Sequence, residues 1–294
     1  MRIQFLNGGL ANQVFQYIFV RFAELYQPTE QWYFDDSFFW VNQVHNGYEL
    51  EKVFGIKANL LSQYFDEDVW EEVITRKKNG ISLPQTFLDM GIPISMLAET
   101  TNYSKFNPFS GEVIRIGANE FHPEVTKIAR ENLYYHGYWI NKQWLESYHD
   151  IICRELQFPI IEDERNTENA NRIKNSLSVG IHVRRGDFVK LGYDIPLYYY
   201  KDSCKQILNE YPMADFFVFS DDIEWCKQND AGMGLNLASK TTYVSGNMEG
   251  NNYRDLQLLS MCRGMIMSNS SFCYLAALLD HNLDFFINPT KREI

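Results

Sequence analysis

The chain has 294 residues, of which 45% are hydrophobic, 15% aromatic and 22% charged, and its formal net charge is −11 at pH 7. This length accommodates two domains, each with its own hydrophobic core. The acidic excess argues against a general binder of nucleic-acid backbones, which needs a basic face. Five cysteines without CxxC spacing indicate reduced thiols. We expect a cytoplasmic protein, because no signal peptide and no membrane-spanning apolar run is apparent.

The first half of the chain is regular only in part. Residues 2–6 (RIQFL) predict a strand, NGGLA (7–11) a loop, and NQVFQYIFVRFAELY (12–26) a helix. Residues 31–35 (QWYFD) are a further strand candidate, whereas no clear period is present over residues 40–120. Regular patterns resume with 132–139 (NLYYHGYW) and with a single predicted helix over 142–156.

The second half alternates strands with helices after a polar stretch, 161–176, that predicts a linker running into an exposed helix. The strand candidates are 177–183, 215–220, 241–246, 264–269 and 283–288. The helix candidates are 196–211, 222–229, 252–263 and 271–280. This alternation predicts a parallel sheet covered on both faces, with ligands bound beyond the carboxyl ends of its strands. We expect an N-terminal domain over 1–160 and a C-terminal domain over 161–294.

Two adjacent arginines stand at one of these strand ends. Arg184 and Arg185 follow a strand and precede Gly186, which allows the backbone to approach a ligand closely. Because side chains alternate along an extended chain, the two arginines cannot face the same way. One could grip phosphate oxygens while the other pairs with Asp187 and holds the loop. Two surface arginines with a helix-capping Asp187 is the simpler alternative.

Other polar segments also lie at strand ends. Asn269, Ser270 and Ser271 open a helix, where free backbone N–H groups and the hydroxyls could bind an anion, although a serine N-cap is the simpler interpretation. The loop 7–13 lacks the GxGxxG spacing of a dinucleotide loop. Asp221–Asp222 and the DED segment 66–68 could hold a metal, although Ser220–Asp222 opening a helix is more simply an N-cap with a favourable charge. The histidine spacing argues against zinc, and no metal is expected.

Four motifs in order resemble the bacterial alpha-1,2-fucosyltransferases of glycosyltransferase family 11. NGGLANQVFQY resembles their GGLGNQMFQY-like signature, and GIHVRRGDFV is similar to the HxRRxDxV box that alpha-1,6- and protein O-fucosyltransferases share in looser form. FFVFSDDIEWCK and DLQLLSMCRGMIMSNSSF resemble the two later boxes. Ala11 departs from a usual glycine, and CYLAALL replaces the usual SWWGAWL after NSSF. The chain ends soon after residue 288, so we expect a usual final helix to be missing.

The resemblance implies an α/β, GT-B-like fold in which two Rossmann-like domains face a cleft. The N-terminal domain would be the acceptor side and the C-terminal domain would bind GDP-fucose. The implied reaction is inverting transfer of L-fucose from GDP-β-L-fucose to the 2-hydroxyl of a galactose-containing acceptor, without a metal or another cofactor. The acceptor would be a galactose-terminated oligosaccharide or a lipid-linked glycan, and the latter would bring the protein to the inner face of the membrane.

The resemblance also assigns roles to single residues. Arg184 would contact the diphosphate, Arg185 with Asp187 would shape the loop, Asp255 would read guanine, and Asn12 would reach toward the fucose. The implied catalytic residues are Arg184, Asp187 and Asn12. The implied donor-binding residues are Gly9, His182, Arg184, Arg185, Asp255, Asn269, Ser270, Ser271 and Phe272. The candidates for a general base are Asp187, Asp194 and His182.

Two rival functions stay open at this point. A non-catalytic nucleotide-sugar or glycan-binding protein would use the same pocket without turnover. A dinucleotide oxidoreductase would bind nicotinamide cofactors, but the missing GxGxxG spacing counts against it.

Overall fold

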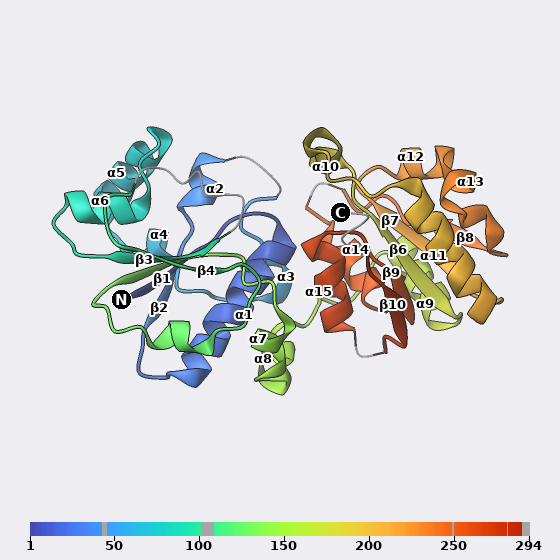
Figure 1. The fold of residues 1–294 in the computed structure, drawn as a ribbon, viewed down its shortest axis with the longest axis horizontal. Coiled ribbons are helices and arrows are strands. Elements are labelled where there is room, and N and C mark those ends of the chain that lie inside the picture. The colour runs from blue at the N-terminus through green and yellow to red at the C-terminus, as the bar shows by residue number, and fades with distance from the viewer. Residues whose placement is uncertain (43–45, 101–108, 249, 281, 290–294) are drawn as a thin grey trace. The chain divides into compact units, whose positions relative to one another are not determined.

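The computed structural model of the protein describes residues 1–42, 46–100, 109–248, 250–280 and 282–289 (Figure 1). The chain divides into two compact units, Met1–Pro159 and Ile160–Ile294. Each unit is built around a five-stranded sheet whose paired strands all run parallel. The predicted α/β class is confirmed.

The sheet of the N-terminal unit has the strand order β2-β1-β5-β3-β4. Its strands are β1 (Arg2–Phe5), β2 (Trp32–Asp35), β3 (Ser95–Thr100), β4 (Val113–Gly117) and β5 (Leu133–His136). Its helices are α1 (Leu10–Tyr26), α2 (Ser37–Val41), α3 (Leu50–Phe54), α4 (Leu61–Tyr64), α5 (Glu67–Lys78), α6 (Leu83–Asp89), the 3₁₀ helix η1 (Pro123–Lys127), α7 (Lys142–Glu146) and α8 (His149–Glu155). Phe19 of α1 packs against Trp32 and Tyr135 on one face, while Trp70 of α5 and Phe87 of α6 pack on the other.

Two sequence-based expectations for this unit need correction. The single helix predicted over 142–156 is wrong, because Tyr148 leaves the helical region (φ −139°, ψ 39°) and separates α7 from α8. Its ring packs against Phe22 at 5.7 Å between centroids. The stretch 40–120, which shows no period, contains α3, α4, α5, α6, β3 and β4. Helices such as α3 and α4 are too short, at five and four residues, to show an amphipathic repeat.

The sheet of the C-terminal unit has the order β10-β9-β6-β7-β8. Its strands are β6 (Ser178–Val183), β7 (Asp215–Ser220), β8 (Thr241–Tyr243), β9 (Gly264–Ile266) and β10 (Phe285–Ile287). Its helices are α9 (Glu164–Lys174), α10 (Gly186–Leu191), α11 (Leu197–Glu210), α12 (Ile223–Gln228), α13 (Asp230–Met233), the 3₁₀ helix η2 (Leu235–Leu237), α14 (Tyr253–Leu259) and α15 (Ser271–Leu279). All five predicted strands are present, and β8, β9 and β10 are shorter than predicted.

The alternation of side chains along β6 decides which helix each residue meets. Val179, Ile181 and Val183 lie in a fully buried cluster with Tyr199 and Cys204 of α11. The intervening Gly180 faces α14 instead. A Cβ atom at Gly180 would lie 2.4 Å from Cδ1 of Leu259, so the glycine lets α14 pack directly on the central strand. The same alternation sends His182 to the α14 side of the sheet.

Two further expectations concern the membrane and the end of the chain. Within the described residues, no helix has both the length and the apolar character needed to cross a bilayer. The expected lack of a final helix concerns the chain end at 290–294, which lies outside the described residues.

We expect Gly180→Ala to destabilise the C-terminal unit by about 1–3 kcal/mol, because the added methyl group overpacks the contact with Leu259. The change in the free energy of unfolding is measured by urea denaturation monitored by circular dichroism. Gly232→Ala is the control, since its Cβ would lie 3.3 Å from Leu197 and meets no shorter contact. Equal stability of the two variants would contradict this packing argument.

Candidate active site

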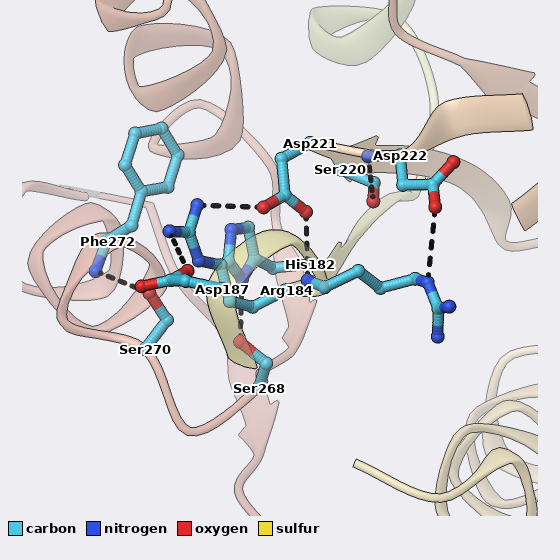
Figure 2. Close-up of polar contacts among 10 residues, drawn as sticks. His182, Arg184, Asp187, Ser220, Asp221, Asp222, Ser268, Ser270 and Phe272 are labelled. Carbon is cyan, nitrogen blue, oxygen red and sulfur yellow. Dashed lines mark hydrogen bonds and ion pairs between the residues drawn. The ribbon is translucent and has the colours of Figure 1, made fainter. Parts of the chain in front are cut away.

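The candidate site lies at the carboxyl edge of the C-terminal sheet. In the sheet register, Val183 of β6 pairs with Ser220 of β7, and Ile181 pairs with Ile266 of β9. Because the three strands are parallel, the polar residues that follow them emerge at the same edge. Figure 2 shows residues from all three segments there.

Arg184 is held between two carboxylates. Its Nη2 atom donates to Oδ1 of Asp187 at 2.6 Å, and its Nη1 lies 2.9 Å from Oδ2 of Asp221 (Figure 2). The Arg184 side chain as a whole stays 28% exposed. The sequence-based pairing of Arg185 with Asp187 is wrong, since Asp187 pairs with Arg184.

The side chain of Arg185 packs against helix α12. Its guanidinium carbon lies 3.6 Å from the ring centroid of Trp225, and its Nε donates to Oδ2 of Asp222 at 3.3 Å. Oδ2 of Asp194 is 4.0 Å from its Nη1. The side chain is 16% exposed. Arg185 therefore contacts Trp225 and Asp222, and its role in shaping the loop stays a prediction.

From the sequence, Asp221 was considered as a metal ligand or as an acidic residue that opens a helix, and its contacts give it a different role. Its Oδ1 accepts the backbone N–H of Arg185 at 2.9 Å, while its Oδ2 binds Arg184. A Cβ on Gly186 would lie 2.6 Å from Oδ2, so the close approach that Gly186 permits is that of the Asp221 carboxylate. The sequence indicates this role of Asp221 only through its position: it directly follows β7, the strand that pairs with β6.

His182 is buried beneath the arginine loop. Its Nδ1 lies 2.8 Å from the Ser268 hydroxyl, and its ring stacks on Phe272 with 5.3 Å between centroids. Burial, together with the nearby charge of Arg184, lowers the His182 pKa to about 3. The imidazole is therefore neutral at physiological pH and a weak proton acceptor, so it fits the general-base role poorly.

The N-terminus of α15 faces this same edge. Ser270 is its N-cap and accepts the backbone N–H of Phe272 at 3.3 Å, so the predicted serine cap is confirmed; Ser271 is the first helical residue. Asn269 donates to the carbonyl of Tyr193 at 2.8 Å. The Asn269 amide oxygen is buried without a donor among the described residues. Such an orphaned acceptor costs about 1–3 kcal/mol, which a ligand donor could offset.

Asp255 of α14 belongs to a separate polar cluster, which it forms with Asn247 and with Asn166 of α9. Its Oδ1 accepts from Nδ2 of Asn247 at 2.7 Å, and Asn247 is paired in turn with Asn166 of α9 through both amide groups. Burial raises the Asp255 pKa to about 7, against the opposing effects of the Asn247 bond and the Arg165 charge. A carboxyl group with such a pKa is a candidate functional group.

Gly9 and Asn12 belong to the N-terminal unit. Gly9 is the N-cap of α1 and has no capping side chain. The buried carboxyl of Glu49 bonds the backbone N–H of Leu10 instead, and burial raises its pKa. Glu49 was not among the site residues predicted from the sequence. Gly8 adopts φ 79°, where a Cβ would lie 2.6 Å from Nδ2 of Asn12, so the loop passes tightly over the Asn12 side chain.

The acidic segments considered as metal ligands serve at helix starts. Asp222 caps α12 by accepting the N–H of Trp225 at 3.2 Å, and Glu67 and Asp68 lie in the first turn of α5. No group of three or more His, Cys, Asp or Glu residues within the described ranges could hold a metal ion.

The fold is that of GT-B-like glycosyltransferases. Fucosyltransferase NodZ from Bradyrhizobium superposes with a TM-score of 0.54 at 13% identity, covering 99% of this chain and 95% of NodZ. A structure of NodZ alpha-1,6-fucosyltransferase soaked with GDP-fucose gives 0.53 at the same identity and coverage. The predicted GT-B-like fold is thereby confirmed.

Residues 110–291 match the family described as Glycosyl transferase family 11, and the chain belongs to this family, as its motifs predicted. The alpha-1,2-colitosyltransferase of Escherichia coli is 25% identical over 292 residues, covering 97% of this chain and 90% of that protein. Human galactoside alpha-(1,2)-fucosyltransferase 1 is 30% identical over 108 residues, which are 34% of this chain and 28% of the human protein. The protein is therefore a glycosyltransferase of the fucosyltransferase-like family, and the oxidoreductase alternative is set aside.

We expect Asp255 to make the stability of the protein pH-dependent. Its folded pKa of about 7 lies above its ordinary value of 3.8, so between these pH values the folded state holds a proton that the unfolded chain has lost. The free energy of unfolding should therefore fall as pH rises from 4 to 7. Asp255→Asn should flatten this slope in urea unfolding, and Asp202→Asn on the exposed side of α11 should leave it unchanged. An unaltered slope in Asp255→Asn would refute the buried-carboxyl argument.

Proposed function

We propose that the protein transfers L-fucose from GDP-β-L-fucose to the 2-hydroxyl of a galactose-containing acceptor, with inversion at the anomeric carbon. The observation that carries this proposal is the partly exposed Arg184 side chain, whose guanidinium is fixed by Asp221 at the carboxyl edge of a parallel sheet. Membership of family 11 and the name of the human galactoside alpha-(1,2)-fucosyltransferase support the donor, the linkage and the acceptor. The GDP-fucose used with NodZ supports the same donor.

The difficult step in such a transfer is the departure of GDP, which gains negative charge as the sugar becomes oxocarbenium-like. A preorganised donor aimed at this charge lowers the barrier. Arg184 offers a planar fork that matches phosphate oxygens, and the α15 N-terminus with Ser270 and Ser271 adds backbone N–H groups and hydroxyls. These groups would neutralise the leaving diphosphate, the task that a divalent cation performs in metal-dependent transferases.

A two-point grip of Arg184 on a diphosphate requires one of its carboxylate partners to give way, because Nη1 and Nη2 both face a carboxylate. Asp187 is 56% exposed, and an exposed pair of this kind is worth about 0–1 kcal/mol. Asp221 is 28% exposed and also accepts the N–H of Arg185, so it is the more firmly held partner. We therefore assign Asp187 as the partner that phosphate oxygens replace. Once released, its carboxylate is free to accept the proton of the acceptor hydroxyl.

Asp255 is proposed to read the guanine base. Guanine presents N1–H and N2–H₂ as adjacent donors, and an ionised carboxylate can accept both. Asn247 holds one carboxyl oxygen, which orients the group on α14. Contact with two donors would favour the charged form and bring the raised Asp255 pKa back down.

The N-terminal unit is proposed to bind the acceptor, and Asn12 with Gly9 is proposed to contact the fucose. Colitose is a second candidate for the transferred sugar, because the Escherichia coli relative carries its name. Fucose differs from colitose by a 3-hydroxyl, so parallel assays with GDP-fucose and GDP-colitose distinguish the two donors.

The proposal is tested by incubating the protein with GDP-fucose, with and without lactose, and measuring released GDP and the linkage of any product by NMR. A glycosyltransferase gives acceptor-dependent GDP release and an α-1,2-linked product. Binding of GDP-fucose without GDP release, across a panel of galactosides, would instead establish the non-catalytic binding protein.

In the same assay we expect Arg184→Ala to lower the rate by on the order of 10²–10³, because one transition-state charge donor is lost. Arg184→Lys should recover little, since a point charge lacks the guanidinium fork. Lys190→Ala, on the neighbouring helix α10, is the control. Near-normal turnover of Arg184→Ala with an unchanged melting temperature would remove Arg184 from the mechanism.

We expect GDP to bind far better than ADP or UDP, with inosine diphosphate between them because it lacks the 2-amino group. Asp255→Ala should weaken GDP binding strongly and ADP binding hardly at all. Competition titrations with the four nucleotides on both proteins check this. A GDP preference that survives in Asp255→Ala would leave Asp255 with the structural role that its bond to Asn247 already gives it.

A further inference from the structure

We propose that a recess in the N-terminal unit binds one pyranose ring of the acceptor glycan, with Lys77 donating a hydrogen bond to that ring. This proposal rests on the function proposed above and adds a sugar subsite to it. The recess has a volume of about 290 Å³. Its lining includes Phe5, Phe38, Lys77 and His136; we call it the Lys77 recess.

Two residues that line the Lys77 recess end neighbouring strands of the N-terminal sheet. Phe5 is the last residue of β1, and His136 is the last residue of the neighbouring strand β5. Their rings lie side by side, with 5.0 Å between centroids. The chain continues from Phe5 into the loop that contains Gly9. In parallel sheets this edge is where ligands bind.

The walls of the recess are aromatic and partly exposed. Phe38 of α2 stands edge-on to Phe5 at 6.2 Å, and neither ring is fully buried. Aromatic rings of this kind can stack on the apolar C–H face of a pyranose. Ligand pockets commonly measure about 300–1,000 Å³, so the recess is sized for a single sugar ring and not for an extended oligosaccharide.

Lys77 supplies the polar contact. Its Nζ donates to the Ser37 hydroxyl at 2.7 Å and lies 4.5 Å from the Phe5 ring centroid. No carboxylate of the described residues lies within 4.0 Å of this nitrogen. An ammonium group has three donors, so one N–H can serve a sugar oxygen. Burial lowers the His136 pKa to about 4, which leaves Lys77 as the charged group of the lining.

The larger hollow beside α1, of about 430 Å³, shows a contrasting arrangement. There Arg21 is paired with Glu155 and Glu24, both at 2.7 Å, and Tyr17 donates to Glu155 at 2.6 Å. The charges of Arg21, Glu24 and Glu155 in that hollow are paired with one another. Lys77 has no such partner in the described chain, which favours the Lys77 recess as the sugar subsite.

The test titrates lactose and methyl β-D-galactopyranoside into the full-length protein by isothermal calorimetry, without nucleotide. Lys77→Met and Phe38→Ala should each weaken the binding of both glycosides on the order of tenfold. Lys78→Met and Phe39→Ala are the matched controls, because each replaces a neighbour of the same type that does not line the recess. GDP binding and GDP release from GDP-fucose in the absence of acceptor should be unchanged in all four variants.

Two results would overturn the proposal: no binding of either glycoside to the native protein, or equal losses in the recess variants and their controls. The proposed transferase function fails separately, through absence of GDP-fucose binding and turnover in the native protein. Because the glycosides are titrated without nucleotide, glycoside binding can still be measured and interpreted if the protein neither binds nor turns over GDP-fucose.

Discussion

The carboxylate of Asp221 joins the two strand ends on which the candidate site depends. One oxygen accepts the backbone N–H of Arg185 and the other binds the side chain of Arg184, so a single residue after β7 fixes both the path and the charge of the loop after β6. Gly186 makes this possible, because any side chain there would meet the same carboxylate. The guanidinium is thereby preorganised before a ligand arrives, which is what electrostatic stabilisation of a leaving group requires.

The rest of the C-terminal unit supports this arrangement. The alternation along β6 buries Val183 against α11 and sends His182 to the side where Ser268 and Phe272 hold it. Arg185 stacks on Trp225 and so ties the loop to α12. A neutral His182 beneath the loop adds no competing positive charge, while the acidic groups around Arg184 and Arg185 keep both guanidinium groups in place before a diphosphate binds.

The sequence predicted those parts of the site that depend on local pattern. β7 has the bounds expected from its apolar run, and the serine cap at Ser270 follows from its place between strand and helix. The pairing of Asp187 with Arg184 could not be predicted from local pattern. It depends on Asp221, which binds Arg184, and on Trp225, which holds Arg185, and both residues lie more than thirty positions further along the chain. Glu49 escaped notice for a similar reason: it caps a helix that begins some forty residues before it. The break at Tyr148 reflects ring packing against Phe22, which no helical period reveals.

The central claim is that Asp221 positions Arg184 while Asp187 yields to the diphosphate. Calorimetric titration of GDP into Asp187→Asn and Asp221→Asn tests it most directly, since both changes remove one negative charge and preserve side-chain size. We expect Asp187→Asn to bind GDP at least as tightly as the native protein, and Asp221→Asn to bind it on the order of tenfold more weakly. Weaker binding in Asp187→Asn, or native affinity in Asp221→Asn, would show that these two carboxylates do not have the roles assigned to them.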